Sequence, residues 1–328
     1  MLDKMLKPNR KFVIESLFSS IGIILFVYLI WSVKPGSIIE AVSHIDPFYF
    51  SISLLLIPVI MVVDTYRWRF LAKDQEVDLK FIEMIKIYTM GFFLSSITPG
   101  GIGGYLRAKL LHDKGKSLGR SISNVVIDIS MKTFSLHIIS VFILVFFFTD
   151  KLSLLFGVLF LIVSSIFPVM VIYRGEKVSS RLIRRLFLLY VSPEYRDTVI
   201  EGVNKIFDRP PRVSSLIKSV LVTDMCFVPL AALQIYTISL SLGISIPFLD
   251  LSAIWIVSLS ISCLPVSISG LGVREWSMAY LSSKYMIDKS TAITLSLLGY
   301  TVLFFIPAAI GALFFIQHTT SGLWKVKK

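Results

Sequence analysis

Two arginines in this chain follow clusters of glycine, a pattern suited to binding an anion. The first cluster is Gly100, Gly101, Gly103 and Gly104 ahead of Arg107, and the second is Gly270 and Gly272 ahead of Arg274 and Glu275. Glycine lets the backbone approach a ligand closely, a helix N-terminus offers free N–H groups, and a guanidinium can donate two parallel hydrogen bonds to a phosphate. We therefore predict that these two segments together cradle a phosphate-bearing head group.

Each arginine also has a simpler interpretation that the sequence leaves open. Arg107 could be an interfacial residue whose long side chain snorkels to the membrane surface. Arg274 could form a structural ion pair with its neighbour Glu275.

A polar stripe interrupts one apolar segment, where Asn124, Asp128 and Lys132 recur every four residues. This spacing places all three on one helix face, and Asp128 and Lys132 could pair along the helix. The stripe is either a charge-neutral packing pair or the lining of a groove that a substrate follows, where the two charges could also couple transport to protons. We expect Asp224 to pair with Lys218 or a neighbouring arginine, and Asp64, Arg67 and Arg69 to be interfacial anchors.

No residue set indicates catalysis, a metal or a cofactor. Gly100–Gly104 lacks the preceding strand and the following Lys-Ser/Thr of a nucleotide-binding loop. The histidines show no metal-ligand spacing. Cys226 and Cys263 lie within apolar segments, so we expect small core residues rather than a disulfide.

The elements that must position these residues are membrane helices. Of the 328 residues, 55% are hydrophobic and only 16% are charged, and the mean hydropathy is +0.79. A soluble domain carries about 25% charged residues. Long apolar runs must be helical in lipid. The net charge of +12 suits cytoplasmic loops on anionic lipid, and we expect no nucleic acid partner.

We predict six full spans and two interrupted segments. The spans are Phe12–Val33, Phe48–Val63, Ser121–Thr149, Leu152–Tyr173, Leu216–Leu242 and Thr291–Gln317. Phe81–Leu110 and Leu251–Tyr285 contain the glycine clusters with Pro99 and Pro265, and proline breaks helices. If both segments are re-entrant hairpins, the outer loops carry few basic residues and both termini are cytoplasmic, as the positive-inside rule requires.

The predicted fold class is thus an all-α polytopic membrane protein, with residues 1–328 forming one membrane domain. Residues 12–150 and 152–317 form two inverted repeats, each reading span, span, hairpin, span, which is typical of transporters. Two similar kinks could also arise by chance. Residues 174–215 form a basic cytoplasmic loop, where Val178–Leu189 has the spacing of an in-plane amphipathic helix.

Three motifs resemble the flippase-like transmembrane region of lysylphosphatidylglycerol synthases. They are Tyr66–Leu71, Ile97–Leu111 and Leu264–Glu275, of which the third is the most specific. The resemblance covers most of the chain and implies a plasma-membrane translocase that moves an anionic, aminoacylated or polyprenyl-phosphate-linked lipid between leaflets. The soluble domain that makes the aminoacylated lipid in relatives is not found in these residues, so we expect no transferase activity.

Two other functions stay open. The chain could be a non-transporting accessory subunit that binds a synthase or glycosyltransferase. It could also be a membrane-embedded transferase, although nucleophile and metal motifs are missing. The expected partner is a membrane phospholipid or lipid-linked substrate, and an oligomer is possible.

Overall fold

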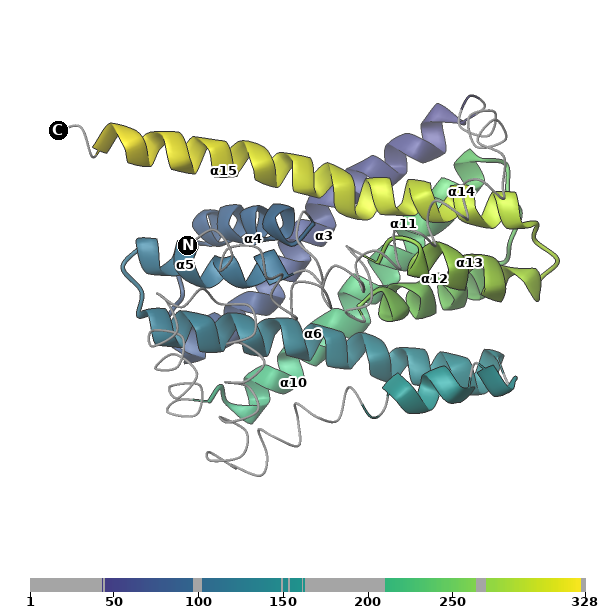
Figure 1. Cartoon of the computed structure of the whole chain (residues 1–328), viewed down its shortest axis with the longest axis horizontal. Coiled ribbons are helices and arrows are strands. Elements are labelled where there is room, and N and C mark those ends of the chain that lie inside the picture. The colour runs from purple at the N-terminus through teal and green to yellow at the C-terminus, as the bar shows by residue number, and fades with distance from the viewer. Residues whose placement is uncertain are drawn as a thin grey trace, which may run out of the picture.

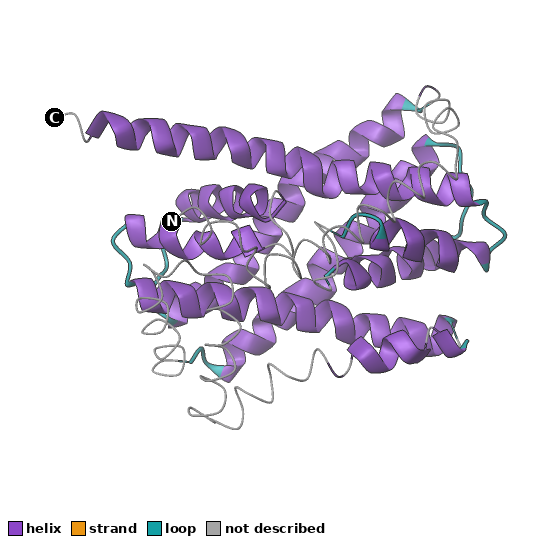
Figure 2. Cartoon of the chain, in the orientation of Figure 1, coloured by secondary structure: helices purple, strands orange, loops and turns teal. Residues whose placement is uncertain are grey.

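A computed structural model of the chain describes residues 43, 45–96, 102–148, 150–152, 154–160, 162, 210–263 and 270–325. Within these ranges the regular elements are helices and there is no strand (Figure 2). The predicted all-α fold is therefore confirmed for the described residues. The predicted first span, most of the basic loop 174–215, and Pro99, Gly100, Gly101 and Pro265 lie outside them.

Within the described residues, four helical rods have a stretch of 28 to 30 residues that is long and apolar enough to cross a membrane. Two are single helices, α3 (Pro47–Asp74) and α6 (Leu118–Phe147). The third joins α10 (Val213–Val222), η4 (Thr223–Phe227) and α11 (Val228–Ser241). The fourth joins α14 (Lys289–Tyr300), η5 (Thr301–Phe305) and α15 (Ile306–Lys325), and its membrane-length stretch is Lys289–His318. They coincide with four of the predicted spans, and residues 154–160 of a fifth are also helical.

Helix α3 begins at a strong start signal and continues well past its predicted end at Val63. The Asp46 side chain accepts a hydrogen bond from the Phe48 N–H at 2.8 Å, and Pro47 occupies the first turn, where its missing N–H costs nothing. The helix ends at Asp74. Its last three turns therefore carry the charged residues that had been expected at a membrane surface.

Both composite rods contain a π-helical turn, and a proline follows each turn closely. Pro229 comes two residues after η4, and Pro307 comes two residues after η5. A proline cannot donate to the carbonyl four residues earlier, and its ring pushes that carbonyl away. The wider π turn relieves this conflict while the rod stays helical.

Two pairs of shorter helices occupy opposite ends of the molecule (Figure 1). At one end α4 (Phe81–Ser96) packs on η2 (Ile102–Leu106) and α5 (Arg107–Asp113), and at the other end α12 (Phe248–Ser262) packs on α13 (Val273–Ser283). Helices α4 and α12 have 16 and 15 residues, so each is about 22–24 Å long. This is shorter than a hydrocarbon core of about 30 Å.

The two halves of the chain pack on each other reciprocally. Helix α4 packs against α15 of the other half, and α12 packs against α6. Within each half, α5 lies on α6 and α13 lies on α14, while α3 of the first half packs lengthwise along the rod of α10, η4 and α11 in the second (Figure 1). Repeats related by a two-fold axis would give this pattern. The number of full spans and the re-entrant character of the short pairs stay predictions.

The helices are held together by a continuous apolar core with close backbone contacts. Its largest buried side chains include Trp68 of α3, Met84 of α4 and Trp255 of α12. A Cβ added at Gly311 of α15 would lie 2.1 Å from the Thr89 carbonyl oxygen of α4. Small residues permit such close approach in membrane bundles, so α4 and α15 form a tightly packed wall.

Candidate functional site

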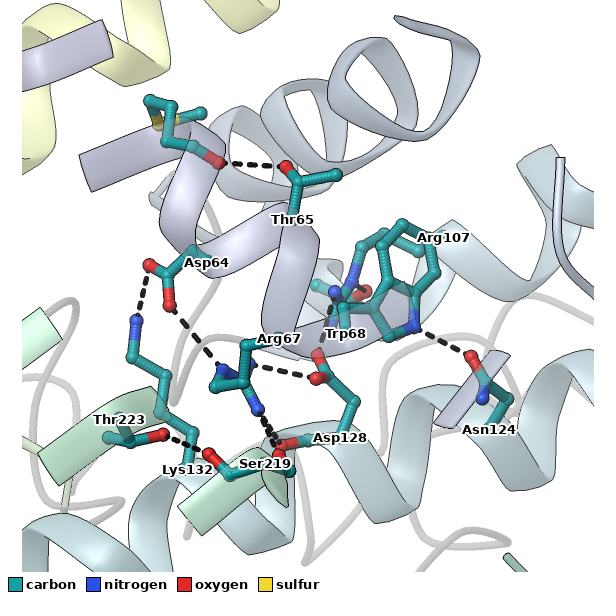
Figure 3. A network of polar contacts seen from close by, with 12 residues as sticks. Asp64, Thr65, Arg67, Trp68, Arg107, Asn124, Asp128, Lys132, Ser219 and Thr223 are labelled. Atoms are coloured by element: carbon teal, nitrogen blue, oxygen red, sulfur yellow. Dashed lines mark hydrogen bonds and ion pairs between the residues drawn. The ribbon is translucent and has the colours of Figure 1, made fainter. Parts of the chain in front are cut away.

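A cluster of five charged side chains lies buried where α3, α5 and α6 meet (Figure 3). It consists of Asp64, Arg67, Arg107, Asp128 and Lys132. Lys132 keeps 19% of its side chain exposed, whereas the other four residues are 4% exposed or less. Three cations and two carboxylates leave the cluster with one net positive charge.

Asp128 joins two arginines from different helices. Its Oδ1 lies 2.8 Å from Arg67 Nη2, and its Oδ2 lies 2.9 Å from Arg107 Nη1 (Figure 3). Arg67 also donates to the Asp128 carbonyl oxygen at 3.4 Å and to Ser219 Oγ at 3.2 Å. Because buried charges need close partners in place of water, Asp128 and Arg67 together tie α3, α5, α6 and α10 to one point.

Lys132 is paired with α3 instead of with its own helix. Its Nζ lies 2.7 Å from Asp64 Oδ2 and 3.8 Å from the centre of the Phe227 ring. Asp64 Oδ1 lies 3.5 Å from Arg67 Nε. The prediction that Asp128 and Lys132 pair along the helix is therefore wrong, because helices α3 and α5 bring oppositely charged groups closer to each of them.

The Arg107 side chain is held between aromatic rings and a glycine. Its guanidinium carbon lies 4.9 Å from the Trp68 ring centre and 5.0 Å from that of Tyr88, and its Nε donates to the Gly104 carbonyl oxygen at 3.2 Å. A Cβ added at Gly91 of α4 would lie 2.2 Å from Arg107 Cγ. Arg107 is thus a buried, fixed residue, and the snorkelling interpretation is wrong.

A chain of hydrogen bonds between polar side chains holds the Trp68 ring in place. Trp68 Nε1 donates to Asn124 Oδ1 at 2.6 Å, and Asn124 Nδ2 donates to Gln75 Oε1 at 3.0 Å. Gln75 Nε2 then donates to Ser123 Oγ at 2.8 Å. Asn124 therefore supports the ring beneath Arg107, and it is not among the residues that line the cavity described next.

All five charged side chains line one cavity of about 160 Å³. The rest of its wall is largely apolar and includes residues of both π turns, among them Phe227 and Phe304. Gln234 of α11 and Cys263, just after α12, also line it. A charged wall opposite an apolar wall suits an amphipathic ligand with an anionic group. Asp128 and Lys132 line this cavity, and the groove that a substrate would follow stays a prediction.

Arg274 belongs to a separate polar cluster at the start of α13. Its guanidinium is ion-paired with Glu275, its Nε lies 3.3 Å from Ser296 Oγ, and its guanidinium carbon lies 4.2 Å from the Tyr300 ring centre. Glu275 Oε2 also accepts from the Gly272 N–H at 2.6 Å and so satisfies a donor at the helix start. The structural ion pair considered for Arg274 is therefore present.

The glycines before Arg274 have backbone geometry that explains their identity. Gly270 and Gly272 have φ of +75° and +81°, a region that glycine adopts without strain. Arg274 does not line the cavity, and no described ion pair or hydrogen bond links it to Arg107. The joint cradle stays a prediction, as does head-group binding by the glycines of both segments.

Other expectations about polar residues are corrected. Asp224 accepts a hydrogen bond from Ser135, whereas Lys218 lies over the Phe70 ring at 5.9 Å. Both cysteines are free and exposed, so their assignment to the core is wrong. Asp64 and Arg67 are buried members of the cluster, and only Arg69 keeps a half-buried position, paired with Asp78. The described residues contain no group of metal ligands.

The sequence matches a known membrane family over most of its length. Residues 13–311 match the family model described as the lysylphosphatidylglycerol synthase TM region. A UPF0104 membrane protein of Pyrococcus horikoshii is 21% identical over 91% of this chain and 95% of its own length. A UPF0104 membrane protein of Methanothermobacter thermautotrophicus is 23% identical over 96% of this chain and 97% of its own length. Another, from Methanocaldococcus jannaschii, is 22% identical over 84% of this chain and 86% of its own length.

Proposed function

Because the chain belongs to the family of the lysylphosphatidylglycerol synthase transmembrane region, we propose that it is a flippase-like translocase. It moves an anionic, aminoacylated or polyprenyl-phosphate-linked lipid between leaflets. The observation that carries the proposal is the cavity between membrane-length helices whose charged wall has one cation in excess.

The excess charge supports a binding site over a purely structural ion network. A charge near the bilayer centre costs at least about 2.5–3.5 kcal/mol unless it is paired or hydrated. A structural network would be most stable if it were neutral. Here the Lys132 side chain is partly exposed and the Arg107 guanidinium lines the cavity. In the proposal these two groups bind the lipid phosphate while the acyl chains stay in the bilayer.

The charges at the two ends of the molecule support an orientation. The end that holds the α5–α6 connection carries Lys109, Lys114, Lys116 and Arg120, and the C-terminal end of α15 lies on the same side (Figure 1). By the positive-inside rule this end is cytoplasmic. The proposal thus places α4 and α5 as a re-entrant hairpin from the cytoplasm, and α12 and α13 as one from outside, in the plasma membrane with both termini cytoplasmic.

In this proposal Arg274 is the counterpart of Arg107 in the second hairpin. Its Nη1 has no hydrogen-bond partner within the described part of the chain, although the residue is fully buried. This leaves one donor for a head group that arrives from the other leaflet. Gly270 and Gly272 would allow the phosphate to approach the backbone there.

The test is exchange of fluorescent lipids in proteoliposomes, read with a membrane-impermeant quencher. The panel contains anionic, aminoacylated, zwitterionic and polyprenyl-phosphate lipids. We expect selective movement of one phosphate-bearing lipid class, lost in Arg274→Ala and partly kept in Arg274→Lys. If well-folded protein moves no lipid, the translocase proposal is refuted. The alternative function, an accessory subunit that binds a synthase or glycosyltransferase, is then favoured.

A further inference from the structure

Gln234 of α11 is a cavity-lining residue with an unsatisfied acceptor. The residue is 1% exposed, and its Nε2 donates to the Ser53 carbonyl oxygen of α3 at 3.0 Å. Its Oε1 has no hydrogen-bond partner among the described residues. A buried acceptor without a donor destabilises the folded state. Its position in the wall of the cavity indicates that a ligand supplies the donor.

The orientation of this amide is fixed by its neighbour. A main-chain carbonyl can only accept, so the nitrogen of the Gln234 amide must face Ser53. The oxygen is then the free atom, and it requires an N–H or O–H group. Arg107 and Lys132 supply hydrogen-bond donors elsewhere in the cavity. Gln234 Oε1 therefore accepts from a donor group of the ligand, which is a different part from the acceptor group that the two cations bind.

The charge and size of the cavity narrow the ligand further. One excess positive charge matches a phosphodiester with a single negative charge better than a phosphomonoester or a zwitterion. The cavity has a volume of about 160 Å³ and is partly open, so a small polar head group can enter it while the acyl chains stay outside.

We infer that the transported lipid is a singly charged phosphodiester whose head group carries a hydroxyl, and that Gln234 is the residue that selects it. The phosphate binds Arg107 and Lys132, and the hydroxyl donates to Gln234 Oε1. This inference rests on the proposed head-group site, and it adds a specificity determinant and a lipid class.

A native cysteine provides a binding assay that is independent of transport. Cys263 is exposed and lines the cavity, whereas Cys226, the only other cysteine, is exposed outside it. The purified full chain in neutral detergent is labelled with a small thiol reagent in the presence of short-chain lipids. A bound head group should slow labelling of Cys263, and Cys226 reports any general effect of the lipid on the reagent.

The probes are phosphatidylglycerol and phosphatidylmethanol, which have the same charge but differ in the hydroxyls. We expect phosphatidylglycerol to protect Cys263 at about tenfold lower concentration, or about 1.4 kcal/mol. Gln234→Met should remove this difference. Thr237→Val should keep it, because Thr237 is buried on the same helix away from the cavity and donates to the Gln234 carbonyl oxygen.

The remaining outcomes separate this inference from the proposed function. Equal protection by both lipids in the wild type, or a tenfold preference that survives Gln234→Met, would refute the role of Gln234. If neither lipid protects Cys263, the head-group site itself is wrong. If deacylated glycerophosphoglycerol protects Cys263 as well as phosphatidylglycerol does, the ligand is a soluble phosphodiester and the inference that it is a lipid is refuted. Gln234→Glu neutralises the cavity and should shift protection towards zwitterionic phosphatidylethanolamine.

Discussion

Replacement of Asp128 by asparagine should destabilise the protein strongly, because this carboxylate neutralises two buried arginines. Asparagine keeps the shape of the side chain but removes its charge. Arg107 then loses its 2.9 Å ion pair, and Arg67 keeps only Asp64 at 3.5 Å. Removing one partner of a buried ion pair costs about 3–5 kcal/mol. We expect the free energy of unfolding of Asp128→Asn to fall by this amount.

Asp78→Asn is a matched control for the same chemical change. Asp78 pairs with Arg69 at 3.1 Å, but the two side chains are 26% and 31% exposed. Such solvated pairs contribute about 0–1 kcal/mol. Thermal unfolding of the purified variants in detergent should therefore show a large fall in the midpoint for Asp128→Asn and a small one for Asp78→Asn.

An anionic lipid should partly rescue Asp128→Asn. The variant has two excess positive charges around the cavity instead of one, so a phosphodiester lipid should raise its unfolding midpoint more than that of the wild type. A zwitterionic lipid with the same acyl chains should give no such difference. If Asp128→Asn is as stable as the wild type, or if both lipids rescue it equally, the reasoning about buried charge is wrong.

Three further changes test other parts of the structure. Gly91→Ala should displace Arg107, because the added Cβ would lie 2.2 Å from Arg107 Cγ. Protection of Cys263 by lipid should then weaken. Gly157→Ala should have no effect, because its added Cβ has its nearest neighbour at 4.0 Å. Glu275→Gln leaves Arg274 without its carboxylate and should cost about 3–5 kcal/mol in stability; an unchanged midpoint would show that the pair is dispensable. Asp288→Ala removes the N-cap of α14, where Asp288 accepts from the Thr291 N–H at 3.0 Å, and should cost about 1 kcal/mol. Partial burial raises the pKa of Asp288, but hydrogen bonds from Thr291 and Ser290 outweigh this effect and lower the pKa below the ordinary 3.8. The cap should therefore stabilise the wild type at neutral pH, and this stabilisation should be lost only as the pH falls through the lowered pKa. An Asp288→Ala variant as stable as the wild type at pH 7 would contradict the capping role.

The membrane helices could be predicted from the sequence because their signals are local. The predicted span Ser121–Thr149 differs from α6 by only a few residues at each end. The end of α3 was missed because hydropathy falls at Asp64. The helix continues because Asp128 and Lys132 neutralise Arg67 and Asp64 from another helix, which a hydropathy window does not register.

The site was predicted only in part, because its pairing depends on which helices pack together. Residue spacing along α6 correctly placed Asp128 and Lys132 on one face, but it could not show that α3 and α5 supply their partners. A usable signal for the missed pair was present. Asp64 and Arg67 are three residues apart on one helix face, beside the conspicuous Trp68. Gln234 carried no comparable signal in its apolar segment.

The most direct test of the central claim is leaflet exchange of a fluorescent anionic lipid by wild type and Arg107→Gln in proteoliposomes. Glutamine cannot supply the charge that binds the phosphate in the proposed site, and a hydrogen bond to a charged group is worth about 1.5–3 kcal/mol. We predict exchange that is slower by about tenfold or more in Arg107→Gln and unchanged in Arg69→Gln, whose arginine does not line the cavity. Equal exchange by folded Arg107→Gln and wild type would contradict the account.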